Sequence, residues 1–158
     1  GVAGMVLNLG KEQLRILHSP PVPLKGTNSD VNNNSLVLHF TYGDVAFLFT
    51  GDLDREGQEY ILRQRKEIAA EILKFPHHGS RLAYVPQFMA QVNPAVTGIS
   101  VGANPFGQPA PLVLTALAEG GVPIYRTDTQ GAITITTDGR TFRVQTFLGA
   151  WWRRNWYD

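Results

Sequence analysis

Short apolar runs alternate along the chain with segments whose apolar residues recur at helical spacing. Residues 35–42 alternate between two faces, which predicts a strand, and residues 45–50 are almost continuously apolar, which predicts a strand covered on both faces. Gly43-Asp44 between them has the composition of a tight turn. The pattern therefore predicts a β-hairpin whose second strand is central in a sheet.

Further strands and helices interleave along the rest of the chain. Helical periodicity is expected at 53–61, 85–92 and 111–119, with Asp54 capping the first of these helices and residues 18–34 forming a loop. Together the elements predict an α/β (α+β) chain. Apolar runs predict the other strands, of which the last two should form a hairpin that completes the sheet: 2–8, 13–18, 72–75, 95–101, 123–126, 132–137 and 141–147.

Composition excludes several classes of function. A chain of 158 residues with 43% hydrophobic content can bury one core, so we expect a single compact unit rather than a disordered chain. The formal net charge of +1 gives no global field for nucleic acid or membrane. No apolar run approaches the roughly 18 residues of a membrane span. Because the chain has no cysteine, any metal must be held by histidine and carboxylate.

The two ends of the sequence carry separate expectations. The chain begins without methionine and enters strand-like sequence almost at once, so we expect a piece of a longer protein. Residues 148–158 form a tail of aromatic and basic side chains beyond a folded unit at 1–147. Such a tail can stack on bases or lie at a membrane interface, but packing on the domain or fraying is the favoured interpretation.

Polar, ligand-capable side chains follow two predicted strands where each ends. Asp52 follows one apolar run, and His77-His78 follows another. Neighbouring imidazoles in a loop can point to different targets, such as a metal ion and a phosphate oxygen. From the residues alone, a metal site and a hydrogen-bonded loop are equally open. His18 and His39 are expected to be structural, because neither has a carboxylate or a second histidine beside it in sequence.

Several segments, in one order, carry a family resemblance. They are Asn33-Asn34-Ser35-Leu36-Val37-Leu38, Phe49-Thr50-Gly51-Asp52, Leu73-Lys74-Phe75-Pro76-His77-His78-Gly79-Ser80, Ile99-Ser100-Val101-Gly102-Ala103-Asn104-Pro105-Phe106-Gly107 and Tyr125-Arg126-Thr127-Asp128-Thr129-Gln130-Gly131-Ala132-Ile133. Together they resemble the second half of the metallo-β-lactamase-like domain of bacterial competence proteins of the ComEC type. The family's fold is a four-layer αββα sandwich. The resemblance implies that residues 1–147 supply its C-terminal half, one mixed sheet with covering helices.

The resemblance also implies roles for individual residues. Asp52 would be a metal ligand with a catalytic role. His78 would be a second ligand and His77 a catalytic group facing the substrate, with these two imidazole roles open to exchange. The implied cofactor is divalent zinc or manganese in the complete domain, with the alternative that this half binds none by itself. Three further side chains would contact the substrate, namely Ser80, Asn104 and Gln108.

The implied activity is metal-dependent phosphodiester hydrolysis by a nuclease-like domain that degrades the non-transforming DNA strand during uptake. A non-catalytic module that binds DNA or scaffolds the uptake channel is an alternative of a different class. A hydrolase of another phosphodiester, such as a phosphorylcholine ester, is a third. The implied partners are single-stranded DNA, the absent N-terminal half of the domain, or a second copy over the uncovered sheet face. The domain would be a soluble part of a bacterial cytoplasmic-membrane protein, with the outer face favoured.

Two departures from the family pattern limit the expected activity. The family's first metal motif, His-x-Asp-x-Asp-His, does not occur in this sequence, and Asp52 with His78 falls short of the roughly three protein ligands that a catalytic ion takes. Gln108 stands where the family typically has the histidine of Tyr-Gly-His-Pro. An amide can bond a phosphate oxygen, but it is no acid at neutral pH and a weak ligand. We therefore expect this chain to be inactive alone.

Overall fold

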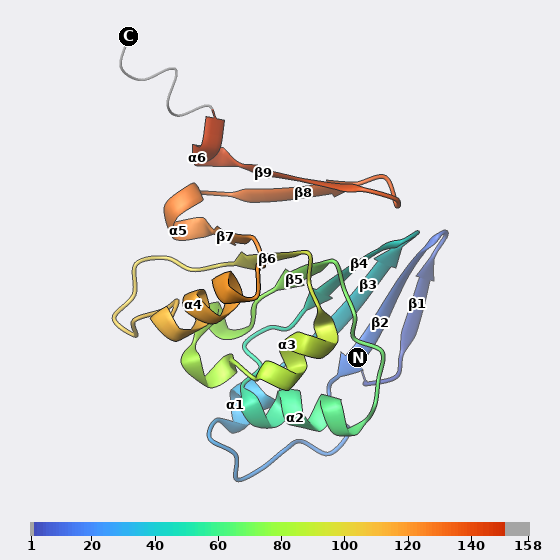
Figure 1. The fold of residues 1–158 in the computed structure, drawn as a ribbon. Helices are drawn as coiled ribbons and strands as arrows, with labels where there is room; N and C mark the ends of the chain where they lie inside the picture. Colours follow the sequence, from blue (N-terminus) through green and yellow to red (C-terminus); the bar gives the residue numbers. More distant parts are fainter. Residues whose placement is uncertain (1, 151–158) are drawn as a thin grey trace.

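The computed structural model describes residues 2–150, with side chains described up to residue 148, so most of the predicted tail lies outside the described residues (Figure 1). The strands are β1 (Val6–Leu9), β2 (Glu12–His18), β3 (Val37–Tyr42), β4 (Val45–Phe49), β5 (Ile72–Lys74), β6 (Val96–Ile99), β7 (Ile124–Arg126), β8 (Ile133–Thr137) and β9 (Phe142–Thr146). The helices are α1 (Asp30–Asn33), α2 (Arg55–Arg63), α3 (Pro86–Val92), α4 (Pro111–Glu119), α5 (Thr127–Gln130) and α6 (Phe147–Ala150).

The strands β1 to β7 form one mixed sheet in the order of the sequence. Strands β1 to β4 pair antiparallel, whereas β4 to β7 pair parallel and need crossovers, which contain α2, α3 and α4. Strand order advances in one direction, and such crossovers are right-handed, so the three helices must lie on the same face of the sheet. Figure 1 shows them together below it.

The main core lies between these helices and the sheet. Leu48 of β4 and Leu73 of β5 meet Ile61 of α2, Phe88 of α3 and Val113 of α4, and each of these side chains is at most 1% exposed. Burying a side chain of this size contributes about 1.5–3 kcal/mol relative to leaving it exposed. The predicted inward faces of the helices at 85–92 and 111–119 are confirmed by this packing.

The last two strands depart from the prediction. β8 and β9 form a separate two-stranded sheet, so the expectation that they complete the main sheet was wrong. The hairpin packs on the face of the main sheet opposite the helices, where it builds a second apolar cluster. Alternation predicts a strand but not the sheet it joins. The cluster comprises Val45, Ile72 and Val96 of the main sheet, with Phe47 and Tyr125, and Ile135, Phe142 and Val144 of the hairpin.

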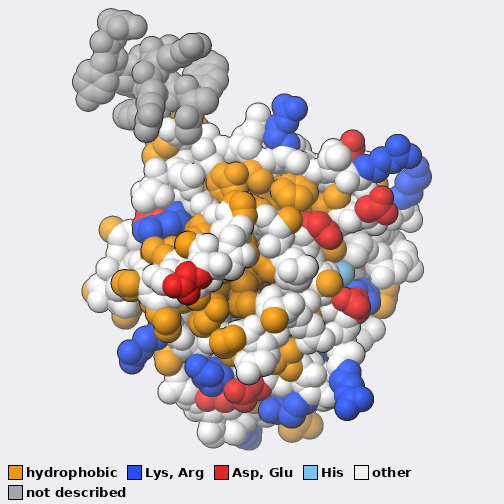
Figure 2. All heavy atoms as spheres, viewed as in Figure 1, with side chains coloured by type: hydrophobic (Ala, Val, Ile, Leu, Met, Phe, Trp, Pro, Cys, Tyr) orange, Lys and Arg blue, Asp and Glu red, His pale blue; other side chains and the backbone are white. Residues whose placement is uncertain are grey.

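The hairpin is fastened to the sheet at its turn. The amide of Asp44 donates to the carbonyl of Gly139 at 2.7 Å, which joins the β8–β9 turn to the β3–β4 turn. Towards the other end the cover is incomplete: Phe49 at the end of β4 is 42% exposed. The prediction of a central strand is confirmed, but the prediction that it is covered on both faces is wrong at this end. Figure 2 shows apolar side chains gathered over the middle of the face in view.

The segment predicted as a loop at 18–34 contains the short helix α1, so that prediction was wrong in part. Ser29 caps the helix by accepting from the amide of Asn32. The described chain is thus a mixed α/β unit with α2, α3 and α4 on one face of a seven-stranded sheet and a hairpin on the other. None of its described helices is both long and apolar enough to cross a membrane.

Candidate active site

Three neighbouring strands deliver the candidate side chains to one edge of the sheet. β4, β5 and β6 are adjacent and parallel, so their carboxyl ends meet at that edge. Residues 50–52, 75–80 and 100–101 follow these ends directly. In sheets of this kind, ligands bind outside the carboxyl ends of the strands. The topology therefore brings Asp52 and the two histidines to the place where a binding site is expected.

The two histidines lie in a left-handed turn. His77, His78 and Gly79 have φ values of 46°, 54° and 81°, a region that side-chain-bearing residues rarely adopt. The turn is held because the amide of His77 donates to the carbonyl of Gly51 at 3.1 Å, and the amide of Ser80 donates to the carbonyl of His77 at 2.8 Å. As a result the two imidazoles point to different partners, with ring centroids 6.2 Å apart and planes at 69°.

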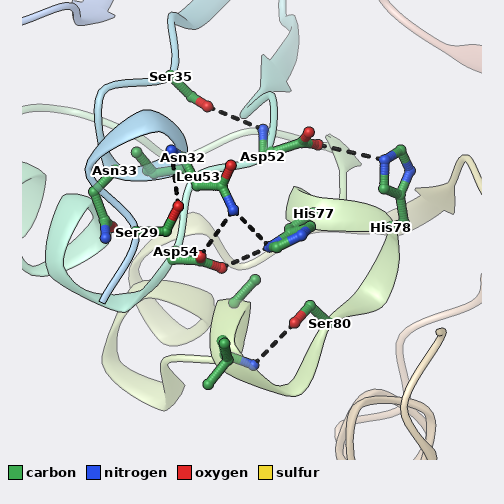
Figure 3. Close-up of polar contacts among 12 residues, drawn as sticks. Ser29, Asn32, Asn33, Ser35, Asp52, Leu53, Asp54, His77, His78 and Ser80 are labelled. Atoms are coloured by element: carbon green, nitrogen blue, oxygen red, sulfur yellow. Dashed lines mark hydrogen bonds and ion pairs between the residues drawn. The ribbon is translucent and has the colours of Figure 1, made fainter. Parts of the chain in front are cut away.

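His78 faces Asp52. Its Nε2 lies 3.6 Å from Oδ1 of Asp52, and both side chains are 44% exposed (Figure 3). Its Nδ1 lies 2.6 Å from the carbonyl oxygen of Ser100, which can only accept, so Nδ1 carries the hydrogen. In the neutral ring the Nε2 lone pair then faces a carboxylate oxygen. Two electron-rich atoms in this arrangement favour a cation between them.

The pair fits one divalent ion. Ligand bonds of about 2.0–2.2 Å in tetrahedral geometry put a nitrogen and an oxygen ligand about 3.4 Å apart, close to the observed separation. A histidine ligand that donates its other N–H to a backbone carbonyl is the usual supporting arrangement. Among the residues that the structure describes, however, no group of three or more His, Cys, Asp or Glu side chains is placed to hold a metal ion. Asp52 and His78 thus offer two ligands, not a complete site.

The backbone around Asp52 is also held. Its amide donates to Oγ of Ser35 at 3.2 Å, and Gly51 before it has a φ of 56° and lies against the Ser35 side chain. The ammonium of Lys74 donates to the carbonyl of Gly51 at 3.2 Å. Burial lowers the pKa of Lys74, and the nearby Asp52 carboxylate partly offsets this shift. These contacts fix the position of the Asp52 backbone after the end of β4.

His77 turns the other way, towards Asp54. Its Nδ1 lies 2.8 Å from Oδ1 of Asp54, whose Oδ2 accepts from Nδ2 of Asn32 at 3.1 Å (Figure 3). Asp54 occupies the N-cap position of α2, but its side chain makes no capping bond within the described chain, so the predicted capping role was wrong. The sequence did not indicate that Asp54 and Asn32 support His77. An Asp directly before a helix has the pattern of an N-cap, and Asp54 is 23 residues from His77 along the chain.

A cleft of about 780 Å³ opens in front of these groups. Gln108 lines this cleft, whereas Asn104 is not among the lining residues. The side-chain amide of Asn104 holds its own loop: Nδ2 donates to the carbonyls of Gly102 and Gln108, and Oδ1 accepts from the amides of Phe106 and Gln108. Ser80 is 7% exposed, and its Oγ accepts from the amide of Leu82. The lining comprises Asp52, His77, His78, Ser80, Arg81, Leu82, Phe106, Gly107, Gln108, Ala110 and Pro111.

The other two histidines are structural, as predicted. His18 is fully buried and its Nε2 lies 2.8 Å from the carbonyl of Asn33. His39 is 3% exposed and its Nε2 lies 2.9 Å from the carbonyl of Ala69. Burial is the main cause that lowers the pKa of each. Neither is among the residues that line the cleft.

The chain is distantly homologous to competence proteins. It is 34% identical over 131 residues to ComE operon protein 3 of Bacillus subtilis, covering 82% of this chain and 16% of that protein. It is 33% identical over 113 residues to competence protein ComA of Neisseria gonorrhoeae, covering 70% of this chain and 16% of that protein. The uncharacterized protein YcaI of Escherichia coli is 26% identical over 140 residues, 85% of this chain and 19% of YcaI. No protein-family model matches the chain.

The chain thus spans about a sixth to a fifth of the length of these relatives, 16% to 19%. The matches support a relationship to competence proteins over most of the chain.

Proposed function

We propose that this chain is the second half of a metallo-β-lactamase-like domain in a competence protein for DNA uptake, and that the assembled domain hydrolyses phosphodiesters. The observation that carries the proposal is the Asp52–His78 pair, with Nε2 and Oδ1 3.6 Å apart and Nδ1 tied to Ser100. The relationship to competence proteins supports DNA as the substrate. In that setting the domain degrades one strand while the other is taken up.

The proposed chemistry divides between a divalent ion and the chain. Zinc or manganese, when bound, supplies activated water and neutralises phosphate charge. Asp52 and His78 would hold it from this side. His77 turns its Nε2 to the cleft, where this atom can take up a proton from water and then donate to a phosphate oxygen. Arg81 lines the same cleft and can pair with the flanking phosphate. These roles place the scissile phosphate between the two histidines.

The rim of the cleft suits a single strand. Phe106 lines the cleft and is 78% exposed, so its ring is free to stack on an unpaired base. Gln108 offers an amide that can bond a phosphate oxygen. Asn104 has its side-chain amide committed to the loop, so its contribution is to hold the wall in place. Ser80 lines the cleft, and its hydroxyl can donate to a phosphate oxygen while it accepts from the amide of Leu82.

The missing ligands must come from elsewhere in the assembled protein. Where the hairpin covers the main sheet incompletely, a groove is lined by Phe47 and Phe49 of β4 and by Ile133 and Ile135 of the hairpin. We propose that the N-terminal half of the domain covers this groove and supplies the first metal motif. A second copy of this chain is the other possible cover, and a dimer that persists in the longer protein would favour it. The assembled domain is proposed to be a soluble part of a cytoplasmic-membrane protein, at its outer face.

The test uses the complete gene product that contains this chain. Purified protein is assayed for cleavage of end-labelled single-stranded DNA with added manganese or zinc, and with EDTA. Asp52→Ala should abolish the metal-dependent cleavage, whereas Asp44→Ala, at an exposed turn, should not change it. Cleavage that survives Asp52→Ala would contradict the proposed site.

A non-catalytic role is the second candidate, and Gln108 in the cleft is the observation that favours it. If the site has lost its chemistry, the protein should bind single-stranded DNA without cleaving it under any divalent ion. A third outcome, cleavage of a small diester such as bis-p-nitrophenyl phosphate without cleavage of DNA, would keep the hydrolase and change the substrate.

A further inference from the structure

We propose that Asp54, braced by Asn32, is a positioning residue that sets the ring orientation and tautomer of His77. This inference rests on the proposed function, because it assigns a role to residues behind the imidazole that faces the substrate. The supporting observations are the contacts of the buried Asp54 side chain and the backbone conformation of His77.

Asp54 is buried although its side chain does not cap the helix that follows it. The residue is 1% exposed, and burying a carboxylate without partners is costly. It stands at the N-cap of α2 with extended backbone, φ −88° and ψ −173°, yet its side chain makes no capping bond within the described chain. Its two oxygens are instead committed to His77 and Asn32, at 2.8 and 3.1 Å. The position of this carboxylate is therefore explained by the histidine, not by the helix.

The geometry fixes which nitrogen of His77 carries the hydrogen. A carboxylate accepts and cannot donate, so the 2.8 Å contact requires a hydrogen on Nδ1. Asn32 lies 3.4 Å from the same Nδ1, farther than Asp54, and its own donor points to the second carboxylate oxygen. The ring then presents Nε2 on its other side. His77 is among the residues that line the cleft, and its side chain is 21% exposed.

Asn32 keeps the carboxylate from rotating. It comes from α1, a helix of one turn whose start is fixed by the Ser29 cap. A bond to each oxygen holds the carboxylate plane, so that Oδ1 remains aimed at the ring. The left-handed backbone of His77, with φ 46°, holds the other end of the contact and is an unfavourable conformation that surrounding structure must maintain. Both ends of the His77–Asp54 bond are thus constrained before any substrate arrives.

The first test reads the His77 ring directly. In long-range ¹H–¹⁵N spectra of this chain at about pH 8, the neutral form of the His77 ring should carry its hydrogen on Nδ1. Asp54→Ala should shift it towards the Nε2–H form. Asn32→Ala should give an intermediate shift.

His18 and His39 serve as internal controls in the same spectra. His18 donates from Nε2 to the carbonyl of Asn33, and His39 donates from Nε2 to the carbonyl of Ala69, so unchanged signals show that a variant is folded. The proposal would be overturned if His77 of the wild type carried its hydrogen on Nε2. It would also be overturned if the His77 signals were the same in the wild type and in a folded Asp54→Ala variant.

The second test uses hydrolysis by the complete gene product. Asp54→Ala should lower kcat by about 10- to 100-fold, the range for removal of a group that orients an active-site ligand, with KM and metal stoichiometry unchanged. An unchanged kcat in Asp54→Ala would overturn the positioning role. A wild-type protein with no hydrolytic activity counts against the proposed function instead, and the spectra then decide the inference alone.

Discussion

The carbonyl oxygen of Ser100 lies 2.6 Å from Nδ1 of His78, on the side of the ring away from Asp52. Ser100 follows β6 and His78 follows β5, so this bond depends on the parallel pairing of the two strands. A backbone acceptor cannot be removed by a side-chain substitution, which makes the orientation of His78 a property of the fold. The orientation of His77 depends instead on side chains, and can be tested by substitution.

Gln108 provides a gain-of-function test. The amide lines the cleft but cannot transfer a proton, whereas an imidazole can serve as acid, base or ligand near neutral pH. If the assembled domain is a hydrolase, Gln108→His should raise its kcat for a small phosphodiester, by about 10-fold or more given the usual size of general acid–base contributions. A histidine placed nearby by Asn104→His is not a suitable control, because this substitution removes the hydrogen bonds from Asn104 to the carbonyls of Gly102 and Gln108.

The control for Gln108→His is Gln108→Ala measured in parallel. If the alanine and histidine variants hydrolyse the diester equally, the glutamine does not limit activity. If the wild type and both variants fail to hydrolyse the diester, the result supports the non-catalytic alternative.

The contact between two turns predicts a stability difference between two glycines. Gly43 has a φ of 60°, and a Cβ added there would collide with the carbonyl of Gly139 in the hairpin turn. Gly121 has a φ of 69° with nothing within 4 Å of an added Cβ, so it shares the backbone strain without the collision. Gly121→Ala should cost about 1 kcal/mol of unfolding free energy, and Gly43→Ala should cost at least about 2.

Urea unfolding of the two variants measures this difference. Equal losses would mean that the hairpin is not held against the β3–β4 turn. Gly43→Ala should also weaken hairpin packing on Val45, which hydrogen exchange of β8 and β9 would report.

The buried histidines predict acid sensitivity. Burial lowers the pKa of His18 and His39 below the ordinary value of 6.5, and the positive charges of Lys66 and Arg15, respectively, act in the same direction. The unfolded chain therefore binds protons more readily than the folded one. Stability from this source is complete above pH 6.5 and falls as the pH drops through and below that value.

Unfolding free energies at about pH 7.5 and about pH 5 test this dependence. A variant with both histidines changed to glutamine, which cannot be protonated, should show a smaller drop between the two conditions even if it is less stable at both. An equal drop in wild type and double variant would assign the acid sensitivity to other groups.

The sequence predicted most elements but not how they assemble. Periodicity located α4 at the bounds observed and placed Phe88 and Val113 in the core, because burial of one helix face leaves a local pattern. It could not assign β8 and β9 to a separate sheet, because alternation is the same in either sheet. The one-turn helix α1 is too short to leave a periodic signal.

The candidate site shows the same division. Strand ends pointed to Asp52 and His78, since adjacent parallel strands deliver residues to one edge. The bond from Asp54 to His77 could not be predicted, because a carboxylate at a helix start looks the same whether it caps the helix or faces a distant imidazole. The resemblance implies that Asn104 contacts the substrate, whereas in the structure its amide bonds Gln108 within the loop, a contact that depends on a loop conformation without a local sequence pattern.

Metal binding by the complete gene product tests the central claim most directly. Titration calorimetry with manganese or zinc should show binding in the wild type, at least a 10-fold weaker affinity in Asp52→Ala and in His78→Ala, and no change in Asp44→Ala. If Asp52→Ala and His78→Ala bind the ion with wild-type affinity and stoichiometry, these two residues are not its ligands and the account is contradicted.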